Sequence, residues 1–276
     1  MPIRAEGVRV EAASSDPELT VAIIGGSGLY ESGLFEREKT HRVSTPWGAP
    51  SGAIEEGHLG GVRTLFLPRH GPGHAYPAHV VNYRANVESL RSLGAQAILT
   101  VNSVGSLKEE LAPGQFVLPE QFVDLTRGRP SSFHNGGHAF HIGMADPFCP
   151  VLSRVADEVA KGSGVSLVTG RTYVCVEGPR FSTRAESRLF RGFADIIGMT
   201  LVPEAPLARE VGICYLPLCM VTDYDVWAER PVDAREVARV MSSNIERVRR
   251  WVHDLVPRIP ARRECGCSRA PLEASF

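Results

Sequence analysis

Lysine, net charge and long apolar runs are all scarce in this chain. Only three of its 30 basic residues are lysines, a bias that decides nothing about chemistry. The formal net charge is −1, so there is no overall electrostatic case for binding nucleic acid or an acidic membrane surface. No apolar run approaches the roughly 20 residues that span a bilayer, and the amino-terminal segment lacks the apolar core of a secretory signal. We therefore expect no nucleic-acid partner, no membrane partner and a cytoplasmic location.

Cysteine is also scarce. Four of the six cysteines have apolar neighbours in the sequence, where a free thiol usually acts as a small buried residue: Cys149, Cys175, Cys214 and Cys219. Cys265 and Cys267 form Cys-Gly-Cys, which could close a small disulfide ring or bind a soft metal ion with ligands from elsewhere. We expect an exposed, redox-capable tail here, with a small stabilising role or no role as the alternative.

Strand-like and helix-like segments alternate along the chain, which indicates the α/β class. We expect a disordered polar leader over residues 1–18, a single domain over residues 19–257, and a tail over residues 258–276. The expected strands cover residues 20–24, 63–67, 97–101, 116–118, 172–176, 195–199 and 214–222. The expected helices cover residues 80–93, 152–161, 183–192, 204–211 and 234–256.

A glycine loop with the sequence IIGGSGLY follows the first expected strand. It lacks the third glycine of a dinucleotide fingerprint, where Glu31 stands, and the acidic residue about 20 positions later, so a dehydrogenase is not expected. Ser27 and the free backbone amides of such a loop suit a single anion such as phosphate. An ordinary tight turn fits this segment equally well.

A second loop, LPRHGPGHAYPAH, places Arg69 and His70 directly after a strand. Arg69 offers a planar fork for two phosphate oxygens, and His70 can donate to a third. His74 lies where a side chain can reach a hydroxyl group or a substrate tail. Because Arg69 and the Ser27 loop are expected at the same end of a parallel sheet, the phosphate reading is stronger for Arg69 than for the loop alone.

Three further segments place small, hydroxyl or aromatic side chains where strands are expected to end. VNSVGSL, residues 101–107, is expected to leave its strand at a turn that includes residues 102–103, where a ligand can approach the backbone. Phe181 can stack on a flat ring just before a helix capped by Thr183 and Glu186. Thr200 follows another strand in the same way.

The segment CMVTDYDVWAE carries two carboxylates, Asp223 and Asp225, at the end of an apolar strand. In an extended backbone residues two apart share a face, so both acids would converge on one small polar ligand, such as the edge of a purine. The alternative is that the pair merely caps a strand end.

These segments, in this order, resemble the trimeric purine nucleoside phosphorylase superfamily from about Val21 to Val256, and more narrowly its S-methyl-5'-thioadenosine phosphorylases. The most specific of them are EGPRFSTRAES, MADPFCP, VPEAPLARE and TDYDVW. The resemblance implies a single-domain nucleoside phosphorylase fold, with a central mixed twisted sheet flanked by helices. It also implies cleavage of 5'-methylthioadenosine by inorganic phosphate, a co-substrate, to adenine and 5-methylthioribose 1-phosphate in purine and methionine salvage. No organic cofactor and no catalytic metal ion are implied.

The resemblance further implies roles for individual residues. Phosphate would be bound by Ser27, Arg69, His70, Asn102, Ser103 and Thr200, although other members often have Thr where Ser27 and Asn102 stand. The base and ribose would lie against His74, Val104, Gly105, Phe181, Ser182 and Met199. Val237 would line the pocket of the 5' substituent. His141 would reach the active site of a neighbouring subunit, which implies a homotrimer or a dimer of trimers.

Breaking a nucleoside C–N bond builds positive charge on the sugar and negative charge on the departing purine. Phosphate would stabilise the positive charge on the sugar, and a proton or hydrogen bond delivered to N7 would stabilise the negative charge on the purine. We assign that donor to Asp223, whose pKa we expect to be raised by burial and by Asp225 nearby.

Carboxylates also accept hydrogen bonds from the 6-amino group of adenine and oppose the carbonyl group of a 6-oxopurine, so we expect adenine as the base. The alternatives are a 6-oxopurine nucleoside or methylthioinosine phosphorylase, a nucleosidase that uses water, and a non-catalytic nucleoside binder. The histidines at 134, 138 and 141 have neither a regular spacing nor a carboxylate to complete a ligand set, so we expect no metal.

Overall fold

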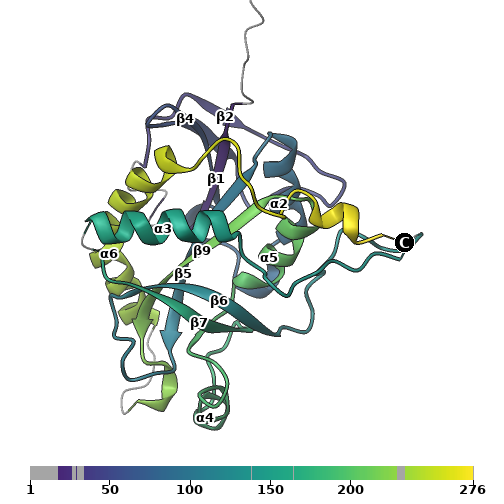
Figure 1. The fold of residues 1–276 in the computed structure, drawn as a ribbon. Coiled ribbons are helices and arrows are strands. Elements are labelled where there is room, and N and C mark those ends of the chain that lie inside the picture. Colours follow the sequence, from purple (N-terminus) through teal and green to yellow (C-terminus); the bar gives the residue numbers. More distant parts are fainter. Residues whose placement is uncertain are drawn as a thin grey trace, which may run out of the picture.

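Strand β1 has apolar residues on both of its faces and lies inside a mixed sheet (Figure 1). The computed structural model describes residues 18–26, 29, 34–137, 139–163, 165–228 and 234–275, and within these ranges the sheet has nine strands. Residues 1–17 of the expected leader, and Ser27, lie outside these ranges. The strands are β1 (Thr20–Gly25), β2 (Lys39–His41), β3 (Ile54–Leu59), β4 (Val62–Pro68), β5 (Ala97–Ser106), β6 (Phe116–Leu125), β7 (Leu167–Val176), β8 (Ile196–Gly198) and β9 (Cys214–Asp223).

Helices cover both faces of the sheet, as expected for an α/β fold. They are α2 (Tyr83–Ser92), α3 (Pro150–Ser163), α4 (Arg184–Phe190), α5 (Leu201–Glu210) and α6 (Ala234–Leu255), with short 3-10 helices at Pro72–His74, Ala78–Val80, Asp225–Trp227, Val256–Arg258 and Ala270–Glu273. None of the helices in the described ranges has the length and apolar character needed to cross a membrane.

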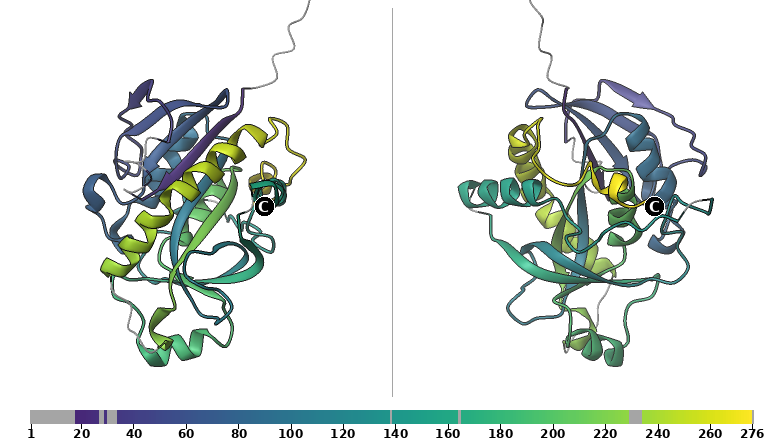
Figure 2. Two further views of the ribbon diagram at one scale, coloured as in Figure 1. Left: turned by 90° about the vertical axis from the view of Figure 1, so that its left-hand side faces the viewer. Right: turned by 45° about the vertical axis from the view of Figure 1, so that its right-hand side comes forward.

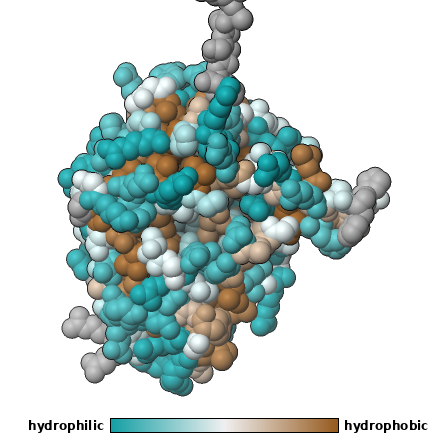
Figure 3. Space-filling model, in the orientation of Figure 1, coloured by the Kyte–Doolittle hydropathy of each residue, from teal (hydrophilic) through white to brown (hydrophobic). Residues whose placement is uncertain are grey.

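The alternation of side chains along β1 builds two separate layers of core. Val21 and Ile23 pack into the layer that contains α3 and α6, whereas Ala22 and Ile24 pack into the layer that contains α2 and α5. This period of two is what a strand buried on both faces requires. In the left view of Figure 2, α6 lies along the strands and covers its face of the sheet. Hydrophilic side chains prevail on the face of the molecule shown in Figure 3.

The sheet closes on itself in one half of the molecule. β5 pairs with both β8 and β9, β9 also pairs with β6, and β6 continues through β7 to β8. The pairing of β5 with β9 shifts register between Val104 and Gly105, and the pairing of β6 with β7 shifts around Pro119. Such irregularities bend strands and allow this closure.

Most expected elements are present, and their boundaries differ most in the bent strands. β5 continues to Ser106, so the expected turn at residues 102–103 is wrong: these residues belong to the strand. β6 and β7 are ten residues each and much longer than expected. β2 and β3 had no counterpart in the sequence interpretation. The capping box of Thr183 and Glu186 is confirmed at the start of α4.

The carboxy-terminal segment packs against the body of the protein. Cys267 belongs to the same core layer as α3 and α6, and the 3-10 helix Ala270–Glu273 contacts α5. The expected exposure of the Cys-Gly-Cys pair is therefore wrong, because Cys267 is buried and Cys265 is half-buried.

Candidate active site

One cavity of about 910 Å³ collects most of the residues predicted from the sequence. It lies where β1, β4, β5 and β9 run in parallel toward the same edge, the usual place for a ligand in such a sheet. The predicted residues that line it are Arg69, His70, His74, Ser103, Val104, Gly105, Phe181, Ser182, Met199, Thr200, Asp223, Asp225 and Val237.

Arg69 supplies a fixed positive charge at one end of the cavity. Its guanidinium donates to both carboxylate oxygens of Glu204, at 2.6 and 3.0 Å, and to the backbone oxygen of Val101 at 3.0 Å. Burial alone would lower the pKa of Arg69, but the charge of Glu204 outweighs it and the pKa is raised. Arg69 is therefore always charged. Glu204, which is fully buried, was not recognised from the sequence, because nothing local to VPEAPLARE shows that its carboxylate meets an arginine 135 positions away.

Asn102 lies behind this end of the cavity, where it joins two predicted phosphate ligands. Its Oδ1 accepts from Arg69 Nη2 and from Thr200 Oγ1, both at 3.0 Å, and its Nδ2 donates to Thr100 Oγ1 at 2.9 Å. Asn102 does not line the cavity, whereas Ser103 does. The amide thus orients Arg69 and Thr200.

His70 and His74 stack beside Arg69 with ring centroids 4.1 Å apart. Nδ1 of His70 lies 2.8 Å from the carbonyl oxygen of Tyr76, which can only accept, so Nδ1 carries the proton. Burial, together with the charge of Arg69, lowers the pKa of His70 to about 3, and the same causes lower the pKa of His74. A neutral His70 with this tautomer has an acceptor at Nε2. The predicted donation from His70 to phosphate would need a protonated ring.

Asp223 and Asp225 line the other end of the cavity, but not through an extended backbone. β9 ends at Asp223, and Asp225 begins a 3-10 helix with a positive φ of 48°. Asp223 Oδ1 accepts from the backbone N–H of Asp225 at 2.8 Å, and its Oδ2 accepts from Thr222 Oγ1 at 2.8 Å. The expected strand geometry is therefore wrong, because the chain turns at this hydrogen bond.

The two carboxyl groups are held where ionisation is unfavourable. Burial raises the pKa of Asp223 and the charge of Asp225 adds to this, although hydrogen bonds from Thr222 and Asp225 oppose it. Burial, assisted by the charge of Glu186, also raises the pKa of Asp225. Oδ2 of Asp225 is buried and has no hydrogen-bond partner within the described part of the chain. This direction for Asp223 agrees with the expectation from the sequence.

Gly105 gives Asp223 its position. A Cβ atom at Gly105 would lie 2.9 Å from Asp223 Oδ1, closer than Cβ contacts come in proteins, and 3.1 Å from Ile197 Cγ2, which is a tight contact. Gly105 pairs with Asp223 across β5 and β9, directly after the register shift. The absence of a side chain therefore lets the carboxyl group rest against the strand.

Phe181, Ser182 and Met199 form a wall between the two ends. Phe181 is 42% exposed, so one face of its ring is available for stacking. Arg129, which the sequence interpretation missed, donates to the backbone oxygens of Met199 and Glu177, both at 2.6 Å, and thereby ties this wall together.

The apolar side chains of α6 form a further wall. Val237 was predicted there, and it lines the cavity together with its neighbours Ala234 and Ala238. Met241 and Ile245, one and two turns further along the helix, line it as well. The sequence predicted a helix over residues 234–256, but it did not show that Met241 and Ile245 face the cavity.

The roles predicted for Ser27 and His141 stay predictions. Ser27 lies outside the described residues, although its neighbour Gly26 lines the cavity. The backbone N–H of His141 donates to the backbone oxygen of Ala274 at 2.8 Å, in an exposed loop away from the cavity. His138 also lies outside the described residues, so the histidines near it are not tested as a group.

The site combines a cationic end, a carboxyl end and an apolar wall around one cavity at the sheet edge, so the chain is of the class of α/β proteins with a small-ligand site at the carboxyl ends of parallel strands. Residues 20–257 match the model of the Phosphorylase superfamily, and the chain belongs to this family. The expected mixed sheet with flanking helices is confirmed by this match and by the topology.

Individual relatives narrow the comparison. The chain is 54% identical over 248 residues to S-methyl-5'-thioadenosine phosphorylase of Pyrococcus furiosus, covering 90% of this chain and 96% of the relative. It is 48% identical over 262 residues to the protein of that name in Nitrosopumilus maritimus, covering 95% and 100%. A structure of methylthioadenosine phosphorylase from Schistosoma mansoni in complex with adenine superimposes with a TM-score of 0.88 at 36% identity, covering 92% of this chain and 96% of that one. The narrower resemblance seen in the sequence is confirmed.

Proposed function

We propose that this chain cleaves 5'-methylthioadenosine with inorganic phosphate to give adenine and 5-methylthioribose 1-phosphate. The observation that carries this proposal is the position of Arg69 and Asp223 at opposite ends of one cavity. Arg69 donates to Asn102 on β5, and Asp223 pairs with Gly105, three residues further along the same strand. At about 3.3 Å per residue these positions are roughly 10 Å apart, which suits a ribose between a phosphate and a purine.

Phosphate would bind at the Arg69 end, near Ser103 and Thr200. The charge of Arg69 favours an anion, and its ion pair with Glu204 keeps the guanidinium from moving. Phosphate held beneath the sugar stabilises the positive charge that develops on the ribosyl ring and then bonds to its anomeric carbon. This reaction needs no organic cofactor and no catalytic metal ion.

Adenine would leave at the Asp223 end. The raised pKa of Asp223 favours a protonated carboxyl group, which can donate to N7 as the C–N bond breaks. Asp225 would accept from the 6-amino group, and its unpaired Oδ2 is suited to this. The methylthio group would lie against Val237 and Met241, because an apolar substituent is favoured by an apolar wall.

We infer a homotrimer or a dimer of trimers for the assembly, with His141 completing the site of a neighbour. Large apolar side chains near α4 remain exposed, Leu189 at 65% and Phe193 at 43%, and such surface favours subunit contact. Light scattering on the purified protein tests this: a monomer would contradict it. The predicted cytoplasmic location stays a prediction.

Initial rates of base release from 5'-methylthioadenosine, methylthioinosine, adenosine and inosine, each with and without phosphate, test the reaction. We expect phosphate-dependent release of adenine, fastest from 5'-methylthioadenosine. Faster release from the inosine compounds would assign the chain to the 6-oxopurine enzymes. Release without phosphate would make it a nucleosidase, and no release would leave only a nucleoside binder.

A further inference from the structure

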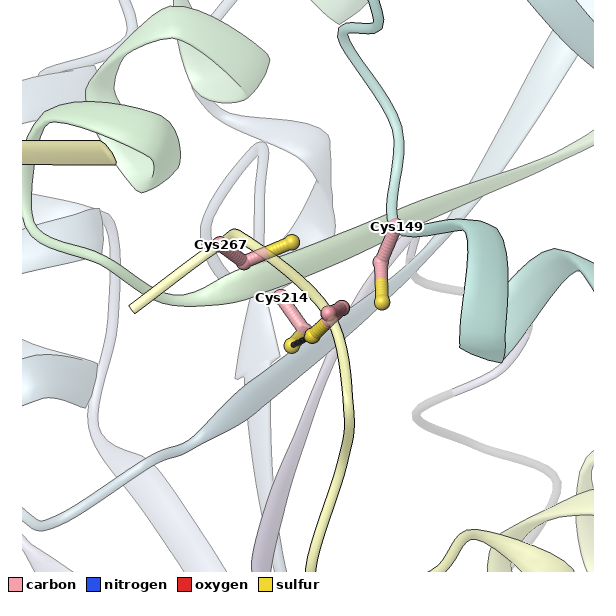
Figure 4. Close-up of side chains that lie close together, drawn as sticks. Cys149, Cys214 and Cys267 are labelled. Carbon is pink, nitrogen blue, oxygen red and sulfur yellow. Dashed lines mark hydrogen bonds between the residues drawn. The ribbon is translucent and has the colours of Figure 1, made fainter. Parts of the chain in front are cut away.

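Strand β9 is anchored near both of its ends. Figure 4 shows Cys214, its first residue, beside Cys149 and Cys267, which come from distant parts of the chain. Near the other end, the backbone N–H and oxygen of Val221 are both bonded to the segment at residues 114–115, at 3.0 and 2.8 Å. The end of β9 that lines the cavity therefore follows a firmly held backbone, and its irregular geometry does not result from fraying.

Thr222 is the extra residue of a β-bulge between β5 and β9. Val221 and Asp223 pair with two neighbouring residues of β5, so Thr222 has no partner of its own in that strand. Bulges next to active sites commonly redirect a side chain. Thr222 lines the cavity and is only 2% exposed, so its hydroxyl group must be satisfied by the protein groups around it.

The hydroxyl group of Thr222 lies within hydrogen-bond distance of two oxygen atoms. Its Oγ1 is 2.8 Å from Asp223 Oδ2 and 3.2 Å from the backbone oxygen of Val104. A hydroxyl group carries one hydrogen, so it cannot donate to both at once. The Val104 oxygen can only accept, whereas Asp223 Oδ2 accepts when the carboxyl group is ionised and donates when it carries the proton. The direction of the bond between Thr222 and Asp223 therefore depends on the protonation state of Asp223.

The other oxygen of Asp223 places the carboxyl proton on Oδ2. Oδ1 accepts from the backbone N–H of Asp225 at 2.8 Å, and a backbone N–H can only donate. With the proton on Oδ2, Asp223 donates to Thr222 and Thr222 donates to Val104. Without that proton, Thr222 turns and donates to Oδ2. Both protonation states of Asp223 thus have a hydrogen-bond partner, and only a hydroxyl hydrogen moves between them.

We propose that Thr222 is a positioning residue for Asp223, with a hydroxyl group that turns between the Val104 oxygen and Asp223 Oδ2 during each reaction cycle. The inference rests on the proposed function, because only a reaction in which Asp223 gives up a proton needs both arrangements. Thr222 acts through Asp223 and not on the substrate itself.

The proton of Asp223 leaves as the base leaves. The C–N bond breaks with its electron pair going to the purine, the O–H bond of Asp223 breaks, and an N–H bond forms at N7, so that neutral adenine departs. Asp223 is then a carboxylate that accepts from the Asp225 N–H and from the Thr222 hydroxyl group. A donor that meets negative charge as it forms stabilises the transition state. Asp223 takes a proton from solvent before the next cycle.

Thr222 is an uncharged neighbour among several charged ones. The charged side chains on the elements packed around this end of the cavity are Lys108, Arg180, Arg184, Glu186, Arg191 and Asp225. Of these, Asp225 raises the pKa of Asp223, in addition to the larger effect of burial. The hydrogen bond from Thr222 lowers the pKa of Asp223. Removing the hydroxyl group therefore alters the titration of Asp223 and leaves every neighbouring charge in place.

Replacing Thr222 with Val keeps the shape of the side chain and removes the hydroxyl group. The carboxylate loses a stronger hydrogen bond than the protonated carboxyl group does, so the alkaline limb of the pH–rate profile should move to higher pH. On the acid side of that limb, where Asp223 is protonated in both proteins, kcat should fall about tenfold or more. Thr222→Ser, which restores the hydroxyl group, should recover both the profile and the rate. Thr64→Val is the control, since Thr64 is buried on β4 and donates to the backbone oxygen of Val62 at 2.9 Å.

Infrared difference spectroscopy separates this inference from the proposed function. The C=O stretch of the protonated carboxyl group, identified by its loss in Asp223→Asn, follows the titration of Asp223 without substrate, and thus even in a protein that cleaves no nucleoside. We expect this band to persist to higher pH in Thr222→Val than in the unaltered protein. A band that titrates at the same or a lower pH would overturn the proposal, and so would equal acid-side rates for Thr222→Val and Thr222→Ser. Should Thr222→Val fail to fold, Thr222→Ala carries the same expectations.

Discussion

Arg69 and Glu204 form a two-pronged ion pair beneath the phosphate end of the cavity, and neither side chain is more than 2% exposed. An ion pair this deep costs desolvation energy, which its direct hydrogen bonds offset. Glu204 accepts two hydrogen bonds from the guanidinium group, and the backbone oxygen of Val101 and the side-chain oxygen of Asn102 each accept one more. Arg69 therefore presents a rigid charge to the cavity rather than a freely moving side chain.

Replacing Glu204 with Gln should leave Arg69 buried without its counter-charge. We expect the free energy of unfolding to fall by about 3 to 5 kcal/mol and the KM for phosphate to rise roughly tenfold or more, because the guanidinium loses its orientation. Chemical denaturation and initial rates at varied phosphate measure the two effects. Glu210→Gln is the control, since Glu210 is buried on the same helix and accepts from the backbone N–H of Phe133 at 2.8 Å away from the cavity. Equal phosphate KM values in both variants would contradict this role.

The phosphate end shows what local sequence can and cannot reveal. Arg69 and Thr200 were predicted because each directly follows an apolar strand, and a strand end at a parallel sheet edge is a local pattern. Glu204 and the role of Asn102 were missed because their partners lie far away in the chain: Arg69 is 135 positions from Glu204, and Thr200 is 98 positions from Asn102. Contacts of this kind follow from the topology and not from periodicity.

Replacing Asp223 with Asn should remove the proton donor for adenine. We expect kcat for 5'-methylthioadenosine to fall by about 10² to 10⁴, because an amide cannot deliver a proton to N7. The ratio of methylthioinosine to methylthioadenosine cleavage should rise, because N7 and the 6-substituent share one edge of the purine and an amide at position 223 can donate to a 6-oxo group there. Initial rates with both nucleosides measure this ratio. Asp195→Asn, which changes a carboxyl group that accepts from the backbone N–H of Thr172, is the control. Full activity in the Asp223 variant would mean that Asp223 and Asp225 only cap the end of a strand and take no part in the reaction.

The raised pKa of Asp223 and Asp225 also predicts how the protein responds to pH. The folded state binds these protons more tightly than the unfolded state, so their contribution to stability is fully present below the ordinary pKa of about 3.9 and is lost as the pH rises through the raised values. Activity that depends on a protonated Asp223 should decline with rising pH over the same window. Asp223→Asn should remove its share of the pH dependence of unfolding, and an unchanged pH profile in that variant would contradict the assignment.

Replacing Gly105 with Ala should displace the carboxyl group of Asp223. The new Cβ would lie 2.9 Å from Asp223 Oδ1, and the side chain of Ile197 at 3.1 Å blocks the other direction. We expect kcat to fall at least tenfold, because misplacing a reacting group is costly in rate. Gly128→Ala is the matched control, since its nearest neighbour would be 3.7 Å away. A rate for Gly105→Ala equal to that of the control would show that Asp223 is not held by this contact.

The closure of the sheet explains why the carboxyl end was only partly predictable. Asp223 and Asp225 were identified from an apolar strand that ends in two acids, and the raised pKa of Asp223 was expected from their proximity. Their geometry was wrong, because a hydrogen bond from Asp225 N–H to Asp223 turns the chain. The strand β5 was expected to stop before Asn102, yet it continues past a register shift to meet Asp223 at Gly105. A register shift of this kind leaves no periodic pattern in the sequence, so it could not be predicted.

Replacing Met241 with Gln should distinguish the two nucleosides that differ only at the 5' position. Met241 lines the cavity one turn after Val237, and Gln keeps its length while adding a polar amide. A methylthio group loses on the order of 1 to 2 kcal/mol of apolar contact there, so the KM for 5'-methylthioadenosine should rise about tenfold. The KM for adenosine, whose 5' hydroxyl can hydrogen-bond to the amide, should change less than threefold. Glu246→Gln is the control, because Glu246 is exposed on the same helix and pairs with Arg249 at 3.4 Å. Equal increases for both substrates would place the methylthio group elsewhere in the cavity, since a wall that contacts only the 5' substituent must act on one nucleoside and spare the other.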